Sequence, residues 1–143
     1  MARLFLMIVM LVAMQSTLAG AEFKSQDEFG RWLTYYYENP EPNRIPDAIK
    51  FMSQDGTLDH NDAISPIFGF LSGVFRDNPE KIGTWLKEMR SLKENHLRVV
   101  VLGLWYSGLP DSKSRVTAFL EKHPNLRASC KTNCWSGINR RMG

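Results

Sequence analysis

The feature that most constrains this chain is the recurrence of apolar residues at intervals of three and four between residues 25 and 123. This spacing places the apolar side chains on one face of an α-helix. The first stretch shows the pattern in a stripe of Phe29, Trp32, Leu33 and Tyr36. Proline, glycine and asparagine separate one stretch from the next, so each helix is short. The sequence therefore predicts an all-α domain.

About six helices follow from these stripes and from the residues that begin and end them. Ser25 and Glu28 have capping-box spacing at the start of the first helix. Residues 97–106 contain a β-branched run that would also suit a buried strand. Because the chain offers no second strand to pair with it, a helix is the better interpretation. The predicted helices cover residues 25–38, 46–54, 61–76, 79–90, 97–107 and 111–123.

A faint internal repeat suggests how these helices pack. Residues 81–88 resemble residues 115–122 at an offset of 34, and Gly69 and Gly103 share that offset. An offset of this size is typical of arrays of two-helix repeats, although the chain carries no full repeat consensus. Two arrangements therefore remain open: stacked antiparallel helical hairpins, as in a solenoid, or a compact bundle.

The third predicted helix, residues 61–76, carries a row of small residues beside its apolar stripe. The row contains Ser65, Gly69, Ser72 and Gly73. Small residues allow a neighbouring helix to approach closely, so we expect this helix to be buried on most sides. On this view, Gly73→Leu would be strongly destabilising through overpacking.

The first 21 residues have the pattern of a signal peptide. A short positive start is followed by an uncharged apolar run, residues 4–14, and by the small-x-small sequence Ala19-Gly20-Ala21. We expect cleavage before Glu22 and export to a periplasm or to the outside of a cell; an uncleaved N-terminal anchor is the alternative. No later apolar run reaches the ~18–20 residues that a membrane span needs.

If the chain is exported, its two cysteines lie in an oxidising compartment. Cys130 and Cys134 are separated by three residues, and in an oxidising compartment they are expected to form a local disulfide. A structural zinc site needs four ligands, and His123 is the only nearby histidine. The predicted organisation is thus a signal peptide (1–21), a helical domain (22–124) and a basic tail (125–143).

No sequence motif points to catalysis. The three histidines, His60, His96 and His123, do not lie in a Ser-His-Asp or metalloprotease pattern. The sequence therefore predicts no catalytic residue, no metal ligand and no cofactor. Catalytic triads assemble from residues far apart in sequence, however, so a site built only by the fold stays open.

Two surfaces are candidates for binding a protein partner. Tyr35 and Tyr37 flank the apolar stripe of the first helix, and exposed aromatic residues are favoured at interfaces. Residues 122–143 hold five basic side chains and no acidic one, among them Arg140 and Arg141, together with Trp135. This charge suits an acidic protein partner. Five charges with one aromatic residue are too few to predict nucleic-acid binding.

Three functions are compatible with this sequence. The first is an exported, non-catalytic protein of the adaptor or inhibitor type that acts by protein–protein interaction, because stacked helical hairpins present extended binding surfaces. The second is a small-ligand or lipid carrier, with a pocket between helices 61–76 and 97–107 lined by Phe70, Trp105 or Tyr106. The third is a small enzyme, for which the sequence offers no motif.

Overall fold

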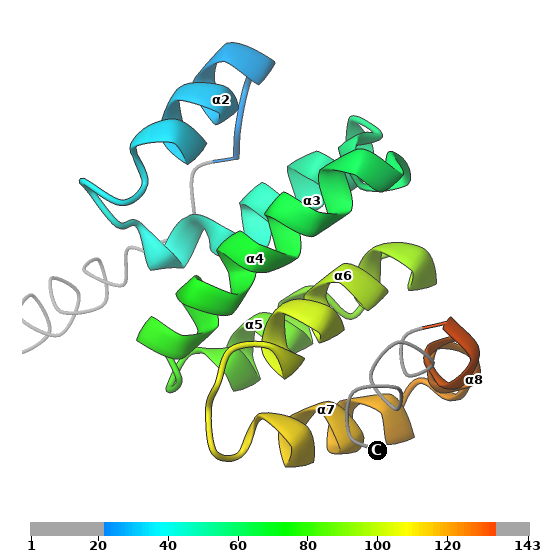
Figure 1. Cartoon of the computed structure of the whole chain (residues 1–143). Coiled ribbons are helices and arrows are strands. Elements are labelled where there is room, and N and C mark those ends of the chain that lie inside the picture. Colours follow the sequence, from blue (N-terminus) through cyan, green and yellow to red (C-terminus); the bar gives the residue numbers. More distant parts are fainter. Residues whose placement is uncertain (1–21, 134–143) are drawn as a thin grey trace, which may run out of the picture.

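The computed structural model describes residues 22–133, with side chains up to Cys130. Within this range the chain is helical and contains no strand, which confirms the all-α prediction. The described residues form seven α-helices and two short 3-10 helices (Figure 1). In chain order they are α2 (Gln26–Tyr35), η1 (Pro42–Arg44), α3 (Ile45–Gln54), η2 (Thr57–Asp59), α4 (Asn61–Asp77), α5 (Ile82–Glu88), α6 (Glu94–Trp105), α7 (Ser112–Glu121) and α8 (Pro124–Asn133).

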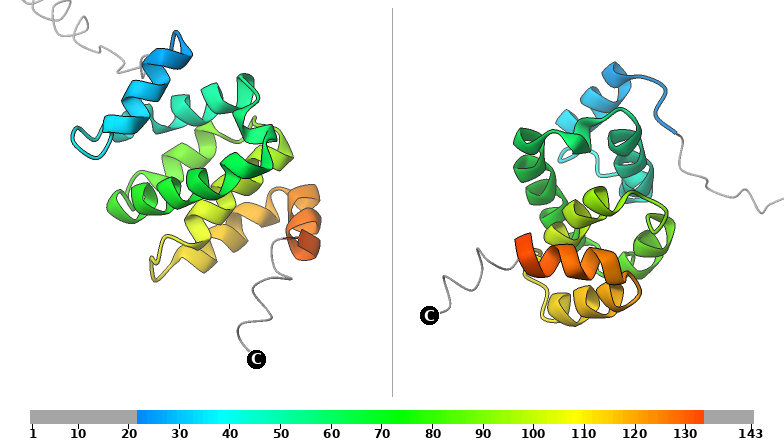
Figure 2. Two further views of the ribbon diagram at one scale, coloured as in Figure 1. Left: turned by 45° about the horizontal axis from the view of Figure 1, so that its top comes forward. Right: turned by 90° about the vertical axis from the view of Figure 1, so that its right-hand side faces the viewer.

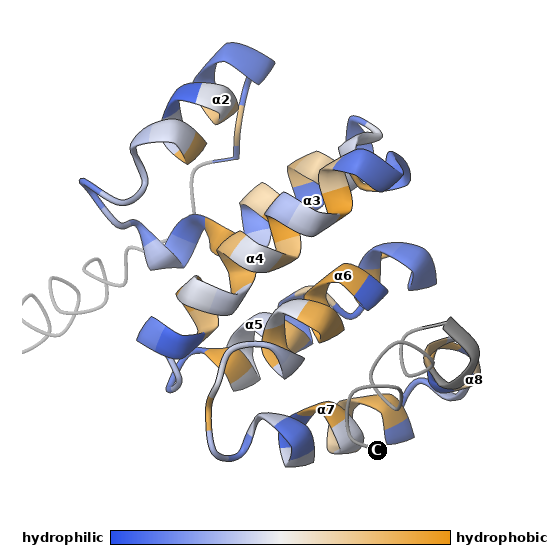
Figure 3. Ribbon diagram, in the orientation of Figure 1, coloured by the Kyte–Doolittle hydropathy of each residue, from blue (hydrophilic) through white to orange (hydrophobic). Residues whose placement is uncertain are grey.

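The helices pack as neighbouring antiparallel hairpins in a compact arrangement. Helix α4 lies beside α6, and α3 contacts α5, so each hairpin packs along the next one (Figures 1 and 2). Helix α8 crosses the end of this array and contacts both α6 and α7. Apolar residues lie where α4, α5, α6 and α7 face one another (Figure 3). The structure thus has the side-by-side hairpins of the first predicted arrangement in a compact form.

The contact between α4 and α6 is the most extensive one between helices in the described part of the chain. It depends on Gly103, because a Cβ atom built there would lie 2.7 Å from Leu71 Cβ and 3.3 Å from Phe75 Cε2. Only a residue without a side chain allows the two backbones to approach so closely. The ambiguous segment 97–106 is therefore a central helix, with Val100 and Leu104 completely buried.

The small-residue row of α4 is not where a neighbouring helix packs, which corrects the expectation that this helix is buried on most sides. Gly69 has no atom within 4 Å of its built Cβ, and at Gly73 the nearest is a flexible arginine nitrogen at 3.8 Å. The buried stripe is Ile67, Leu71, Val74 and Phe75. The expected overpacking at Gly73 has no structural basis, since the close approach occurs at Gly103.

Helix α2 stands apart from the other helices and is attached by side chains (Figure 1). Ser25 Oγ accepts a hydrogen bond from the Glu28 N–H at 3.2 Å, as the capping-box spacing predicts. The Glu28 carboxylate accepts from the Lys24 N–H at 3.0 Å and from the Arg44 guanidinium at 2.9 Å. These two contacts lower the pKa of Glu28. Arg44 also lies 4.0 Å above the Phe23 ring, so it joins the segment before α2 to the start of α3.

Helix α8 extends the helical part beyond the predicted boundary at residue 124. Pro124 ends α7 and also begins α8, because proline is well tolerated in the first turn of a helix. Leu126 and Cys130, four residues apart, are completely buried. This pair is the short apolar stripe of α8, and it was the one signal in the sequence for a seventh helix.

Candidate functional site

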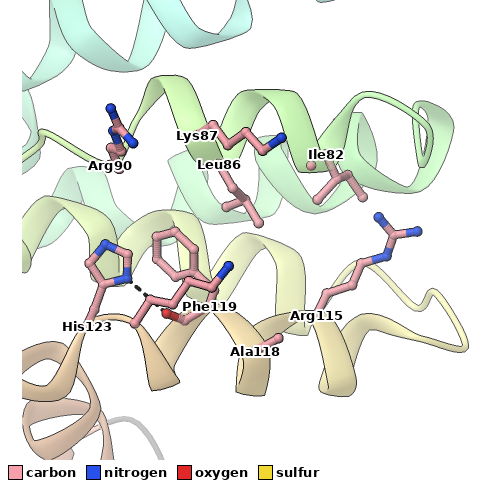
Figure 4. A pocket seen from close by; sticks show the side chains of 10 residues that line it. Ile82, Leu86, Lys87, Arg90, Arg115, Ala118, Phe119 and His123 are labelled. Carbon is pink, nitrogen blue, oxygen red and sulfur yellow. Dashed lines mark hydrogen bonds between the residues drawn. The ribbon is translucent and has the colours of Figure 1, made fainter.

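A groove with an apolar floor and a basic rim lies between α5 and α7. Its volume is about 460 Å³. Ile82, Leu86 and Phe119 project into the space between the two helices (Figure 4). Ile82 and Phe119 belong to the core, while Leu86 is only partly covered, so the floor of the groove continues the core outward. Among the apolar lining residues, the side chains that remain open to solvent are Leu86, in part, and Ala118, so a partner would meet a small apolar surface inside a polar rim.

The rim of this groove carries one sign of charge. Ten residues line it, including four basic side chains, and none of them is acidic. Arg115 is engaged: its Nε donates to Asp111 at 2.6 Å and its Nη1 donates to the Pro79 carbonyl at 3.3 Å. Within residues 22–133, no carboxylate lies within ion-pair distance of the other three basic side chains, Lys87, Arg90 and Lys122. Their charges are therefore available to an anionic ligand.

His123 closes one end of the groove. Its ring stacks on Phe119 with the centroids 4.2 Å apart. Its Nδ1 lies 2.9 Å from the Phe119 carbonyl oxygen. Because a carbonyl only accepts, Nδ1 must carry the hydrogen, and Nε2 is left as the atom of the ring that can meet a ligand. The ring is held in place before anything binds.

The internal repeat explains why a groove forms here. Helices α5 and α7 hold the two copies of the repeated segment and run in the same direction, with Ile82 and Arg115 at one end and Arg90 and His123 at the other (Figure 4). Each is the second helix of its hairpin, so they line the same side of the array. On the other side, α4 and α6 meet closely at Gly103. No glycine-mediated contact of this kind draws α5 and α7 together.

The predicted tyrosine surface lies at the end of α2. Tyr35 is 54% exposed and Tyr37 is 76% exposed, whereas Tyr36 between them is buried. Burial, together with the charges of Asp77 and Glu41, raises the pKa of Tyr36 to about 12. The Tyr37 hydroxyl donates to Glu38 at 2.9 Å. We call this acidic, aromatic surface the tyrosine edge; it consists of Tyr35, Tyr37, Glu38, Glu41 and Asp77.

The other predicted site residues fall at or beyond the limits of the described chain. Glu22, which would follow the signal cleavage, is the first described residue and is exposed. Ala19, Ala21, Cys134, Trp135, Arg140 and Arg141 lie outside the described residues, so signal cleavage, the disulfide and tail binding stay predictions. Cys130 is buried on α8.

A Ser-His-Asp group, which no sequence motif indicated, forms at the start of α6. His96 is completely buried. Its Nδ1 lies 2.8 Å from Ser53 Oγ on α3, and its Nε2 lies 2.8 Å from Asp59 Oδ1 on η2. Asn95 donates to the same Asp59 oxygen at 3.0 Å. The hydrogen bond from His96 is the main cause that lowers the pKa of Asp59.

This group ties three segments of the chain together. Both ring nitrogens of His96 are engaged by Ser53 and Asp59, and no ring atom reaches the surface. The distance from Ser53 Oγ to His96 Nδ1 is the hydrogen-bond reach that a nucleophile and its general base need, but the group lies at the junction of α3, η2 and α6 and not in the α5–α7 groove. The three residues are far apart in sequence, and sequence spacing alone could not bring them together.

The carrier interpretation placed a pocket between α4 and α6, where the structure has a close helix contact. Its three proposed lining residues do not meet there. Phe70 packs on Trp32 and Tyr36 of α2. Trp105 lies under the Lys113 ammonium group, and Tyr106 is 51% exposed.

No protein-family model, curated protein or solved structure matches this chain. No helix between residues 22 and 133 is long and apolar enough to cross a membrane. In the same range, no three histidine, cysteine or acidic side chains are grouped to hold a metal ion. The groove and the tyrosine edge are the two surfaces of the described chain that bear on function.

Proposed function

We propose that this chain is an exported, non-catalytic protein that binds a protein partner in the groove between α5 and α7. The observation that carries the proposal is the combination of an apolar floor with unpaired basic side chains and no acid in the lining. A partner of matching chemistry presents apolar side chains flanked by carboxylates. Export rests on the signal-peptide pattern of residues 1–21.

The floor and the rim of the groove contribute to binding in different ways. Covering apolar surface contributes roughly 25 cal/mol for each Å² removed from water. The rim charges contribute mainly to the choice of partner and to the rate of association, since opposite charges steer the encounter and like charges oppose it. Lys87, Arg90 and Lys122 can make these contacts without first breaking an ion pair within the described chain.

The proposal gives the Ser53–His96–Asp59 group a structural role. The group lies at the junction of α3, η2 and α6, whereas the groove lies between α5 and α7. A chain that acts by binding needs a rigid surface, and a buried polar tie between hairpins supplies rigidity.

The test is affinity capture from native extract with mature chain 22–143 as bait, compared with the variant Lys87→Glu/Arg90→Glu. The matched control is Lys24→Glu/Arg31→Glu, which reverses two charges near and on α2, away from the groove (Figure 1). We expect one stoichiometric partner with the wild type and the control, and loss of that partner with the groove variant.

Equal capture by all three baits would overturn the role of the groove. Because charge reversal at exposed sites changes stability little, circular dichroism of each bait serves to confirm that the fold is intact. A bait that returns no protein but carries a bound lipid would replace this proposal with the carrier function.

A further inference from the structure

The tyrosine edge of this chain combines exposed aromatic rings with carboxylates, which is the chemistry expected of a partner for the groove. We propose that the tyrosine edge of one copy docks into the α5–α7 groove of a second copy, so that the protein associates head to tail. This inference rests on the proposed function of the groove as a protein-binding site. It deepens that function by naming a partner, which is a second copy of this chain.

The aromatic part of the edge matches the floor of the groove. Tyr35 and Tyr37 are among the large hydrophobic side chains that the described chain leaves exposed. Tyrosine rings supply a large contact area and lose little conformational freedom on binding. The groove volume of about 460 Å³ lies within the ~300–1,000 Å³ range of clefts that hold a drug-sized molecule, so it has room for phenol rings.

The charged part of the edge matches the rim. Glu38 and Glu41 lie in the short connection between α2 and η1, where the Tyr37 hydroxyl donates to Glu38 at 2.9 Å, so these acids lie at this end of α2. Asp77, the last residue of α4, acts together with Glu41 on the pKa of Tyr36. Asp77 is paired with Arg76 at 3.3 Å and Glu41 with Arg44 at 3.6 Å, while Glu38 has no ion pair among residues 22–133. Glu38 would therefore meet the unpaired rim cations first.

Acidic and basic residues are also unevenly distributed between the two halves of residues 22–133. Residues 22–79 hold five basic and ten acidic side chains, whereas residues 80–133 hold ten basic and five acidic ones. Two acidic halves repel each other, as do two basic halves, so a symmetric pairing of like surfaces is disfavoured. An acidic half of one copy facing a basic half of the next is favoured, and the contact is heterologous when each pair of copies makes it once.

The edge cannot fill the groove of its own chain in this structure. The edge lies at the ends of α2 and α4, and the groove is lined by residues of the α5–α7 region (Figures 1 and 4). Each copy therefore presents both surfaces at once. A contact of this type builds a ring if the rotation closes and an open chain if it does not.

The experiment is sedimentation velocity of mature chain 22–143 from low micromolar to near-millimolar protein concentration, at low and at high salt. We expect the weight-average sedimentation coefficient to rise with concentration, and to rise less at high salt because salt screens the charges. A coefficient that stays at the monomer value over the whole range overturns the inference.

Two variants test which surfaces meet. The edge variant is Tyr35→Ser/Tyr37→Ser, the groove variant is Lys87→Glu/Arg90→Glu, and Tyr106→Ser is the control because it removes a half-exposed tyrosine outside the edge. We expect each of the first two to be monomeric alone and the control to associate like the wild type. An equimolar mixture of the edge and groove variants should form a complex of one copy each and nothing larger, because each still carries one intact surface.

The outcomes separate this inference from the proposed function. A chain that is monomeric, but whose groove still captures another protein, overturns only the inference. Association that survives both variants also overturns it, because the surfaces would lie elsewhere. Capture that is independent of the groove overturns the proposed function, whatever the state of association.

Discussion

Gly103 and Gly69 offer a stringent test of the packing. They occupy the same position of the sequence repeat, but a neighbouring helix lies close to Gly103 and no atom lies within 4 Å of a Cβ built at Gly69. Alanine at Gly103 would place its Cβ 2.7 Å from Leu71 Cβ. Carbon atoms at optimal contact are about 3.5–4.0 Å apart, so α4 and α6 would have to separate by about 1 Å. The contact between these two helices is the most extensive in the described chain, so the strain falls on the centre of the fold.

The magnitude follows from two opposing effects. Overpacking of a core costs about 1–3 kcal/mol, and replacing glycine by alanine inside a helix returns about 0.8–1 kcal/mol. The difference is a loss of up to about 2 kcal/mol in the free energy of unfolding for Gly103→Ala. At Gly69 no atom lies within 4 Å, so Gly69→Ala should raise it by about 0.5–1 kcal/mol.

The assay is urea unfolding of both variants and the wild type, followed by far-ultraviolet circular dichroism. A domain of this size shifts its melting temperature by about 4 °C for each kcal/mol, so thermal melting gives a second measure. The sign of the effect should differ between the two glycines. If Gly103→Ala proves as stabilising as Gly69→Ala, the close approach of α4 and α6 is refuted.

Three further predictions concern polar groups, of which His96 and Tyr36 are buried and Asp59 is exposed. His96→Ala should lower the free energy of unfolding by about 2–4 kcal/mol, because it leaves a cavity and deprives Ser53 and Asp59 of their partner; urea unfolding measures this, and an unchanged midpoint would contradict it. The lowered pKa of Asp59 means that its contribution to stability is present above the ordinary aspartate pKa of about 3.9 and is lost as the pH falls toward the lowered value. Asp59→Asn should therefore flatten that part of the acid-unfolding curve. The raised pKa of Tyr36 means that folding favours the neutral phenol, so stability should fall as the pH rises from about 10 toward 12. Tyr36→Phe should remove this alkaline loss, and it should cost little at neutral pH because the buried hydroxyl has no hydrogen-bond partner among the described residues.

The groove shows how a weak repeat can produce a binding surface. The repeated segments place α5 and α7 on the same side of neighbouring hairpins. Trp85 and Phe119, two large aromatic residues, occupy the same position of the repeat. Nothing in the repeat requires a basic rim. Lys87, Arg90 and Lys122 come from positions that sequence patterns alone show as ordinary solvated charges, and their common setting emerges when the two helices lie side by side (Figure 4).

The helices themselves were determined by the sequence. Apolar periodicity, the Ser25 cap and the proline and glycine boundaries act over a few residues, and hydrogen bonds within one helix need no distant partner. The all-α class and six of the seven helices therefore follow from local patterns. The predicted ends differ by a few residues: the first helix is shorter than 25–38, and the fourth begins at Ile82. Helix α8 escaped prediction because its stripe has two members, Leu126 and Cys130.

Tertiary structure alone decided which faces meet. It placed the close glycine contact at Gly103 although Gly69 has the equivalent sequence position, because α4 packs along α6 while α2 stands away from the equivalent face of α4. It brought His96 to Ser53 and Asp59 across separations of 43 and 37 residues. It also placed the tyrosine edge and the basic groove on different helices. Such contacts depend on the relative placement of whole helices, which local spacing does not specify, and both the groove and the tie at His96 arise at that level.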